Sequence, residues 1–265
     1  MAKVYGEASR CEVDVHGASL ARESGALVPE LVDVPNPRVA VWRWVPTDDT
    51  APGPAALSRL GRDLARLASV PAQEAPVHWL DNLTLRAAAL DRWPDDQDVR
   101  WLAAELRAVA VSDVAVAAPL AFQHGDLSMS NLVHDGRSLH LVDFETIRAA
   151  PREWDRACLR VASERYAALP SDALARVLDA AGAADLDVLG ACVRAKSLMN
   201  ASWLFLMREL DPALVTEARC RVRSLRDGVP HRWRDLGVLA DQPAWRGDST
   251  SLASTSVVEN ASSEV

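Results

Sequence analysis

Residues 122–133 read FQHGDLSMSNLV, and residues 139–145 read LHLVDFE. Between these segments the chain contains Asp135-Gly136 flanked by two short β-prone runs, which is the strongest short-range signal for a β-hairpin. Folding this hairpin returns Asp143 to the end of the sheet at which Asp126 and Asn131 already lie. The sequence therefore predicts that three oxygen-bearing side chains converge on one volume.

The three converging side chains suit a particular chemistry. A carboxylate at Asp143 and an amide oxygen at Asn131 are ligands that Mg²⁺ prefers, and this ion keeps part of its shell for substrate phosphates. Asp126 beside them can accept the proton of an attacking hydroxyl. An ordinary surface turn explains an Asp-Gly hairpin alone, but it does not explain these acids and the asparagine in this order.

The order of the motif matches a phosphoryl-transfer pattern. His-x-Asp, an asparagine five residues after the aspartate and a second acid after an apolar run correspond to His-Arg-Asp-x-x-x-x-Asn followed by Asp-Phe-Gly. Gly125 stands in place of the arginine and Glu145 in place of the final glycine. The motif thus indicates transfer of a phosphoryl group.

On these residues the sequence resembles the aminoglycoside phosphotransferase and choline kinase family, which are small-molecule kinases with a protein-kinase-like fold. Residues 124–127 with Asn131 resemble that family's catalytic loop, and residues 141–145 resemble its metal-binding strand end. The resemblance runs from about Lys3 to about Glu209. It implies an α+β, two-lobe fold with a small, β-rich N-terminal lobe and a larger, mainly helical C-terminal lobe.

The resemblance also implies an activity. We expect a phosphotransferase that moves the γ-phosphoryl group of ATP or GTP to a substrate hydroxyl, with an alcohol group as acceptor. Asp126 would orient and deprotonate the hydroxyl, Asn131 and Asp143 would hold Mg²⁺, and Glu145 would complete the shell of a second metal ion. Catalysis in such sites is mostly positioning and charge neutralisation.

Two features argue against a protein substrate. Only eight residues separate Glu145 from Trp154, whereas protein kinases have a much longer activation segment there. Gly125 also removes the arginine that would contact an activation-loop phosphate. The resemblance makes His124 and Asp155 structural supports of the catalytic loop.

Residues 1–46 are expected to form a partial nucleotide-binding lobe. Lys3, in a β-prone segment, resembles the strand lysine that holds nucleotide phosphates and is oriented by an acid on a helix. We expect Glu12 to be that acid, with Asp14 and Glu23 as alternatives. The competing interpretation of Lys3 is that it is merely a charged residue near a frayed terminus.

A hinge between the lobes is expected after this segment. Arg43, Trp44 and Val45 follow a β-rich run, and the resemblance places adenine contacts at such a hinge. The competing interpretation is a buried edge strand.

The family carries a strand, a glycine-rich turn and another strand before the lysine, but only two residues precede Lys3 here. We expect either a start site that lies upstream or a naturally reduced lobe. The missing loop motivates an alternative function, a non-catalytic nucleotide-binding relative that resembles a pseudokinase.

The remaining organisation follows from composition. Residues 47–54 are a polar, Pro/Gly-rich hinge or linker, residues 55–246 the larger lobe, and residues 247–265 a Ser/Thr-rich tail expected to be disordered. Leucines at 57, 60, 64 and 67 have helical spacing. The resemblance makes the C-terminal helices a substrate wall, for which the candidates are Glu164, Trp203, Glu209 and Asp211. The alternative is that the three acids lie on solvent-exposed helix faces and that Trp203 lies in the core.

Composition limits the partners. A net charge of −8 argues against nucleic acid, no apolar run reaches the roughly 18 residues of a membrane span, and the start lacks a signal peptide. The four scattered cysteines suit reduced thiols, so we expect a cytoplasmic protein. The acidic balance slightly favours a cationic, hydroxyl-bearing substrate such as an aminoglycoside or another antibiotic, followed by choline, homoserine and sugar-like metabolites.

Overall fold

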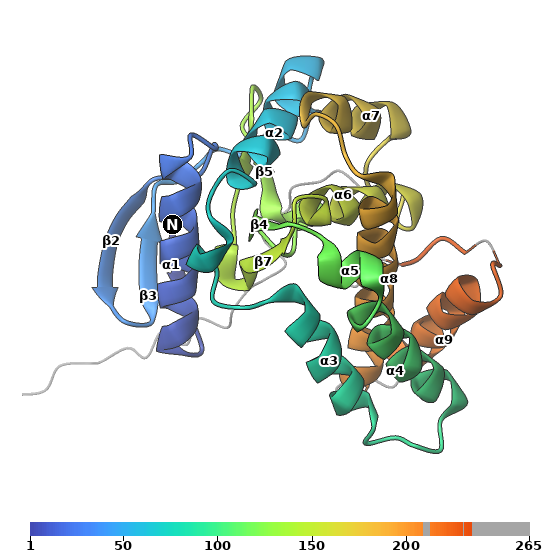
Figure 1. The fold of residues 1–265 in the computed structure, drawn as a ribbon. Helices are drawn as coiled ribbons and strands as arrows, with labels where there is room; N and C mark the ends of the chain where they lie inside the picture. Colours follow the sequence, from blue (N-terminus) through green and yellow to red (C-terminus); the bar gives the residue numbers. More distant parts are fainter. Residues whose placement is uncertain (209–212, 230, 235–265) are drawn as a thin grey trace, which may run out of the picture.

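The computed structural model describes residues 1–208, 213–229 and 231–234. These residues form a small N-terminal lobe and a larger helical lobe, which lie side by side in Figure 1. The expected tail over residues 247–265 and the substrate candidates Glu209 and Asp211 lie outside the described residues.

The small lobe is an antiparallel sheet packed against one helix. Its strands are β1 (Ala2–Val4), β2 (Leu31–Asn36) and β3 (Val39–Trp42), in the order β1-β3-β2. The helix α1 (Ala8–Glu23) stands between this sheet and the larger lobe (Figure 1). Because β1 pairs Lys3 with Ala40 of the central strand, the lysine backbone is fixed in the sheet.

The connection between the lobes ends at α2 (Pro54–Leu67). Proline suits the first turn of a helix because its missing N–H would have no intrahelical partner there. The four leucines with helical spacing are all buried in α2, as the sequence predicted. Residues 43–53 carry no helix or strand, and the linker bounds 47–54 stay a prediction.

The larger lobe is built around one long helix. Helix α8 (Leu186–Leu206) contacts five other helices, so its middle is buried on several faces. Among the described residues, no helix is both long and apolar enough to cross a membrane. The other helices of this lobe are α3 (Trp79–Leu90), α4 (Gln97–Ala110), α5 (Asp113–Ala117), α6 (Trp154–Glu164), α7 (Ser171–Ala180) and α9 (Ala213–Arg226).

Two small antiparallel strand pairs hold the segment around residues 120–151. Strand β4 (Leu120–Gln123) pairs with β7 (Arg148–Pro151), and β5 (Leu132–His134) pairs with β6 (Leu139–Leu141). The second pair confirms the hairpin predicted from Asp135-Gly136. Gly136 has φ of 86° at its turn, and Asp135 accepts hydrogen bonds from the backbone N–H groups of residues 137 and 138.

The two lobes meet where α1 lies against the 3-10 turn η3 (Phe144–Thr146). A Cβ atom on Gly17 would lie only 2.8 Å from Ile147 Cγ2 and 2.9 Å from Phe144 Cβ. The absence of a side chain at Gly17 therefore allows the close approach. This contact brings α1 to the segment that carries Asp143.

Candidate active site

The loop that follows β4 is anchored to the start of α6. The backbone N–H groups of His124 and Gly125 donate to the two carboxylate oxygens of Asp155, at 2.8 and 3.0 Å. The indole N–H of Trp154 donates to the Gly125 carbonyl at 2.8 Å. Asp155 is fully buried, and burial raises the pKa of its carboxyl. This anchoring fixes the backbone immediately before Asp126.

A second set of hydrogen bonds ties the same loop to the strand that ends at Asp143. His124 Nε2 lies 2.9 Å from the Val142 carbonyl, which can only accept, so this ring nitrogen is the donor. The His124 ring also packs on Phe144, with 4.7 Å between ring centroids. This buried histidine contacts the loop and the strand end together, and has no geometry for proton transfer to a ligand.

Asn131 connects the two halves of the motif. Its side-chain Nδ2 donates to the Asp126 carbonyl at 2.8 Å, and its own carbonyl accepts from the Val142 N–H at 3.1 Å. Asp143 follows directly in a left-handed conformation, with φ of 68°. A non-glycine residue in this region is strained, and such strain is concentrated at functional sites. The hairpin therefore joins the backbone of Asp126, Asn131 and the residue before Asp143, and convergence of the three side chains on one volume stays a prediction.

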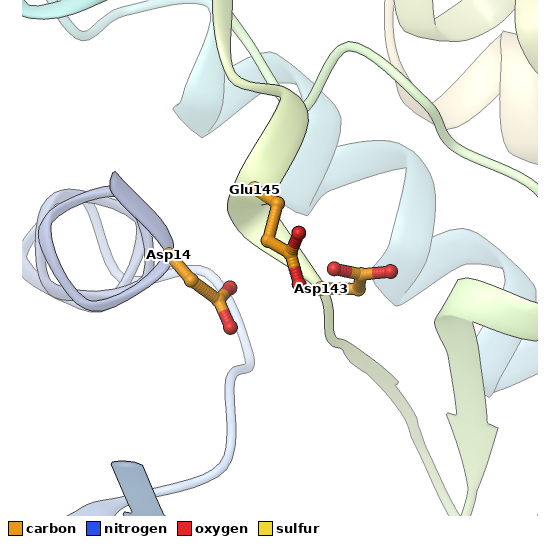
Figure 2. A group of neighbouring side chains, drawn as sticks. All are labelled: Asp14, Asp143 and Glu145. Carbon is orange, nitrogen blue, oxygen red and sulfur yellow. The ribbon is translucent and has the colours of Figure 1, made fainter. Parts of the chain in front are cut away.

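Lys3 joins the small lobe to this site. Its ammonium lies 2.9 Å from Asp14 and 2.8 Å from both Asp143 and Glu145, so one cation contacts three carboxylates. Figure 2 shows that Asp14 projects from α1 toward the two acids of the η3 segment. Burial alone would lower the pKa of Lys3, but the charges of Asp14 and Asp143 outweigh it and raise this pKa. Lys3 is therefore a charged residue held in place.

The helix acid beside Lys3 is Asp14, which corrects the expectation of Glu12. Asp14 is buried, and it accepts hydrogen bonds from the Tyr5 hydroxyl and the Phe144 N–H, both at 2.5 Å, as well as from Lys3. Glu12 is exposed to solvent. A separation of two residues turns a side chain about 200° around a helix, so the two acids cannot face the same neighbour.

The acids around Lys3 fit a divalent cation. Three carboxylates face the Lys3 ammonium and the more distant Arg10 guanidinium, which leaves an excess of negative charge, and the carboxylate ligand atoms lie within 4.8 Å of one another. Both oxygens of Asp14 already accept hydrogen bonds, and Glu145 contacts Lys3 through Oε1 and Arg10 through Oε2, so the Oδ2 atom of Asp143 is the carboxylate oxygen most open to an ion. Only the Oδ1 atom of Asp143 contacts Lys3, and this side chain is 43% exposed. Hard carboxylate oxygens with an open side are the donors that Mg²⁺ uses.

A lysine that the sequence did not single out lies on the other side of the motif. Lys196 of α8 is buried, and its Nζ is 2.5 Å from Asp126 Oδ1. The Lys196 charge lowers the pKa of Asp126 to about 2. Lys196 is the only charged residue between Arg194 and Arg208, and an isolated lysine in an apolar helix is the signal that could have found it.

The hinge candidates lie in the segment between the lobes. Arg43, Trp44 and Val45 directly follow β3, and the Arg43 guanidinium pairs with Glu30 at 2.6 Å. Trp44 is 56% exposed, so it is not the core residue of an edge strand. Contact of these residues with a nucleotide base stays a prediction.

A cavity of about 610 Å³ opens beside Asp126, between the catalytic loop and the helical lobe. Trp203, one of the expected substrate residues, lines it. Glu164 does not, because its exposed carboxylate pairs with Arg160 one helical turn away, at 2.6 Å. The acidic substrate wall suggested from the sequence is thus absent from the described part of this cavity, where Asp126 is the only acid.

Comparison with known proteins identifies the family and the fold. The model of the phosphotransferase enzyme family matches residues 14–195, which include the whole motif. No curated protein matches the sequence.

Solved structures share the fold. A choline/ethanolamine kinase family protein from Mesorhizobium loti has a TM-score of 0.65 and 18% identity, over 85% of this chain and 80% of that chain. The GDP complex of aminoglycoside 2'-phosphotransferase-IIIa has a TM-score of 0.62 and 15% identity, over 86% and 93% of the two chains. The apoenzyme of macrolide 2'-phosphotransferase MphH from Brachybacterium faecium has a TM-score of 0.56 and 14% identity, over 87% and 84%. At these identities the likenesses show the fold, and the expected two-lobe, protein-kinase-like α+β architecture is confirmed.

Proposed function

Because this chain belongs to the phosphotransferase enzyme family, we propose that it transfers the γ-phosphoryl group of ATP or GTP to the hydroxyl group of a small molecule. One observation carries the proposal. Asn131 donates from its side chain to the Asp126 carbonyl and accepts at its backbone carbonyl from the N–H of Val142, the residue directly before Asp143, so the two halves of the motif meet at Asn131. The spacing in the sequence and the folded geometry therefore support the same chemistry.

The acid cluster supplies the nucleotide side of the proposed site. Asn131, Asp143 and Glu145 would hold Mg²⁺, which neutralises charge on nucleotide phosphates when it is bound. Lys3 would contact the phosphates, and Asp14, rather than Glu12, holds it there from the buried face. Residues 43–45 would contact the nucleotide base from the segment between the lobes.

Asp126 supplies the acceptor side. With a pKa of about 2 its carboxylate is ionised at neutral pH, so it can accept a hydrogen bond from a substrate hydroxyl. A carboxylate with so low a pKa is a weak base. We therefore assign Asp126 chiefly to orienting the hydroxyl toward the phosphorus, with the proton transferred as the new bond forms.

Turnover tests this proposal directly. Release of nucleoside diphosphate is measured with Mg·ATP or Mg·GTP and a set of hydroxyl-bearing small molecules, and the phosphorylated product is identified by ³¹P NMR. Asp126→Asn is compared with Asp187→Asn, an exposed acid at the start of α8. We expect acceptor-dependent release by the wild type and by Asp187→Asn, and a loss of about 100-fold or more in Asp126→Asn. Turnover by Asp126→Asn at the wild-type rate would contradict the proposal.

A further inference from the structure

The cavity beside Asp126 is positively charged. Arg10, Arg86, Arg148, Lys196 and Arg221 line it, whereas Asp126 is its only acid within the described ranges. Three of the five cations are compensated by acids: Lys196 by Asp126 at 2.5 Å, Arg221 by Glu217 at 2.9 Å and Arg10 by Glu145 at 3.7 Å. Arg86 and Arg148 are left.

Neither of these two arginines has a carboxylate partner in the part of the chain that the structure describes. Arg86 of α3 donates from Nε to Asn82 at 2.9 Å and from Nη1 to the Met199 carbonyl at 3.5 Å, and Arg148 of β7 donates from Nε to the Thr146 carbonyl at 3.2 Å. Arg148 is only 5% exposed, and its Nη1 atom is buried without a hydrogen-bond partner among the described residues. A buried guanidinium N–H without a partner is costly, since it has lost its water.

Both arginines line the cavity that Asp126 also lines, so their guanidinium groups share one site with the proposed reacting hydroxyl. Burial, together with the charge of Arg148, lowers the pKa of Arg86 to about 10, and burial also lowers the pKa of Arg148. The charge of Asp126 acts on both arginines in the opposite direction. Arg148 Nε also lies 2.6 Å from the position that a Cβ atom on Gly125 would take, directly beside the catalytic loop.

Repulsion between two desolvated cations is relieved by an anion placed between them. Guanidinium groups bind carboxylates and phosphates through paired N–H donors, and such charge-assisted hydrogen bonds are strong. The arginines are on the acceptor side of the site, because Lys3, Asp143 and Glu145 do not line this cavity. The cavity of about 610 Å³ has the volume of a small-molecule site.

Resting on the phosphotransferase activity proposed above, we infer that the acceptor is a small hydroxyl compound that also carries a phosphate or carboxylate group, held by Arg86 and Arg148. The anionic group lies between the two guanidinium groups, and the hydroxyl lies against Asp126. The acceptor is therefore anionic, in contrast to the cationic substrate that the net charge of −8 favoured. The charge of the whole chain and the charge of this cavity have opposite signs.

The test is binding, measured on the full chain without nucleotide, so that it is separate from turnover. The probes are inorganic phosphate, glucose 6-phosphate, glucose and glucosamine, which include an anionic, a neutral and a cationic form of one sugar. We expect the two phosphate-bearing probes to bind and glucosamine not to bind. Arg86→Gln should weaken phosphate binding about 10- to 100-fold, because it removes charge-assisted hydrogen bonds. Arg62→Gln, an exposed arginine of α2, is the matched control and should bind like the wild type.

The Arg86 variant also separates a binding role from a structural one. Arg86 is only partly buried, and relief of its repulsion with Arg148 offsets the loss of its hydrogen bonds to Asn82 and Met199, so the melting temperature of the free protein should change little. Arg148 packs on Trp154, with 5.3 Å from the guanidinium carbon to the ring centroid, so its substitution disturbs folding and serves only as a second variant.

The phosphate groups of the nucleotide are the other ligand to which Arg86 could bind. A second measurement therefore compares nucleotide binding by Arg86→Gln and the wild type. Stabilisation by Mg·ATP should be the same in Arg86→Gln and the wild type. Loss of that stabilisation in Arg86→Gln would assign the arginine to the nucleotide and overturn the inference. Absence of phosphate binding by the wild type, equal binding by Arg86→Gln, or preference for glucosamine would overturn it as well. Phosphate binding without any turnover would instead count against the proposed activity and leave the anion site standing.

Discussion

Substitution of Asp14 tests whether Asp14, rather than Glu12, is the acid of α1 that stabilises the contact between the lobes. In Asp14→Ala, the Tyr5 hydroxyl and the Phe144 N–H, both buried, lose their acceptor at 2.5 Å. Leaving a buried donor without a partner costs about 1–3 kcal/mol. Lys3 keeps Asp143 and Glu145 at 2.8 Å, so it adds little to the loss. The expected destabilisation is therefore about 2–5 kcal/mol for the two orphaned donors.

The matched control for this variant is Glu12→Ala. Glu12 lies on the exposed face of the same helix, so its substitution should change the free energy of unfolding by about 0.5 kcal/mol or less. Urea unfolding followed by circular dichroism measures both values. For a chain of this size the Asp14 variant should also melt roughly 4–20 °C below the wild type. A Glu12→Ala protein that is as destabilised as Asp14→Ala, or an Asp14→Ala protein as stable as the wild type, would refute the assignment.

Two further variants test contacts that hold the site together. Lys196→Met should move the acid limb of the turnover profile upward by about 2 pH units, because the lysine charge is the main reason that the pKa of Asp126 falls from 3.8 to about 2. In the wild type the same ion pair stabilises the fold above pH 3.8 and loses this effect as the pH falls toward 2, so the melting temperature of Lys196→Met should depend less on pH in that range. An unchanged acid limb would contradict the conclusion that the Lys196 charge lowers the pKa of Asp126. Gly17→Ala should destabilise the protein by about 1–2 kcal/mol, because its Cβ would lie 2.8 Å from Ile147, whereas Gly190→Ala, in open space on α8, should stabilise it by about 0.5–1 kcal/mol. Equal effects of the two glycine variants in urea unfolding would contradict the close approach of α1.

Local patterns in the sequence were sufficient for part of this site. The Asp135-Gly136 turn depends on neighbouring residues only, and it alone places Asp143 beside Asn131. The leucine spacing of α2 likewise predicted its buried face. Both features rest on interactions within a few residues, which the order of the sequence expresses directly.

Contacts between distant segments could not be obtained in that way. Asp14 rather than Glu12 faces the site because of the rotation of α1 against the η3 segment. The contact of Gly17 with Phe144 and Ile147 fixes this rotation, and about 130 residues of chain separate the two segments. Lys196 reaches Asp126 from a position 70 residues away. No periodic pattern encodes such a pairing.

The charge of the substrate cavity is the clearest case. Arg86 and Arg148 lie on α3 and β7, and the packing of α3 against β7 and α8 brings the two arginines to one cavity. Net charge is a sum over the whole surface and carries no information about one cavity. The expectation of a cationic substrate rests on the acidic composition alone, whereas the anionic acceptor proposed above rests on the residues that line the cavity.

Thermal shift with Mg·ATP and Mg·GTP, on the wild type and on Asp143→Ala, tests the nucleotide site most directly. A ligand that binds only the folded protein stabilises it by mass action and so raises its melting temperature. At a ligand concentration 100 times Kd the stabilisation is about 2.7 kcal/mol. We expect a Mg²⁺-dependent rise in the wild type that disappears in Asp143→Ala, with Asp187→Asn behaving like the wild type. No rise in the wild type, or an equal rise in Asp143→Ala, would contradict a metal-dependent nucleotide site at Asn131, Asp143 and Glu145.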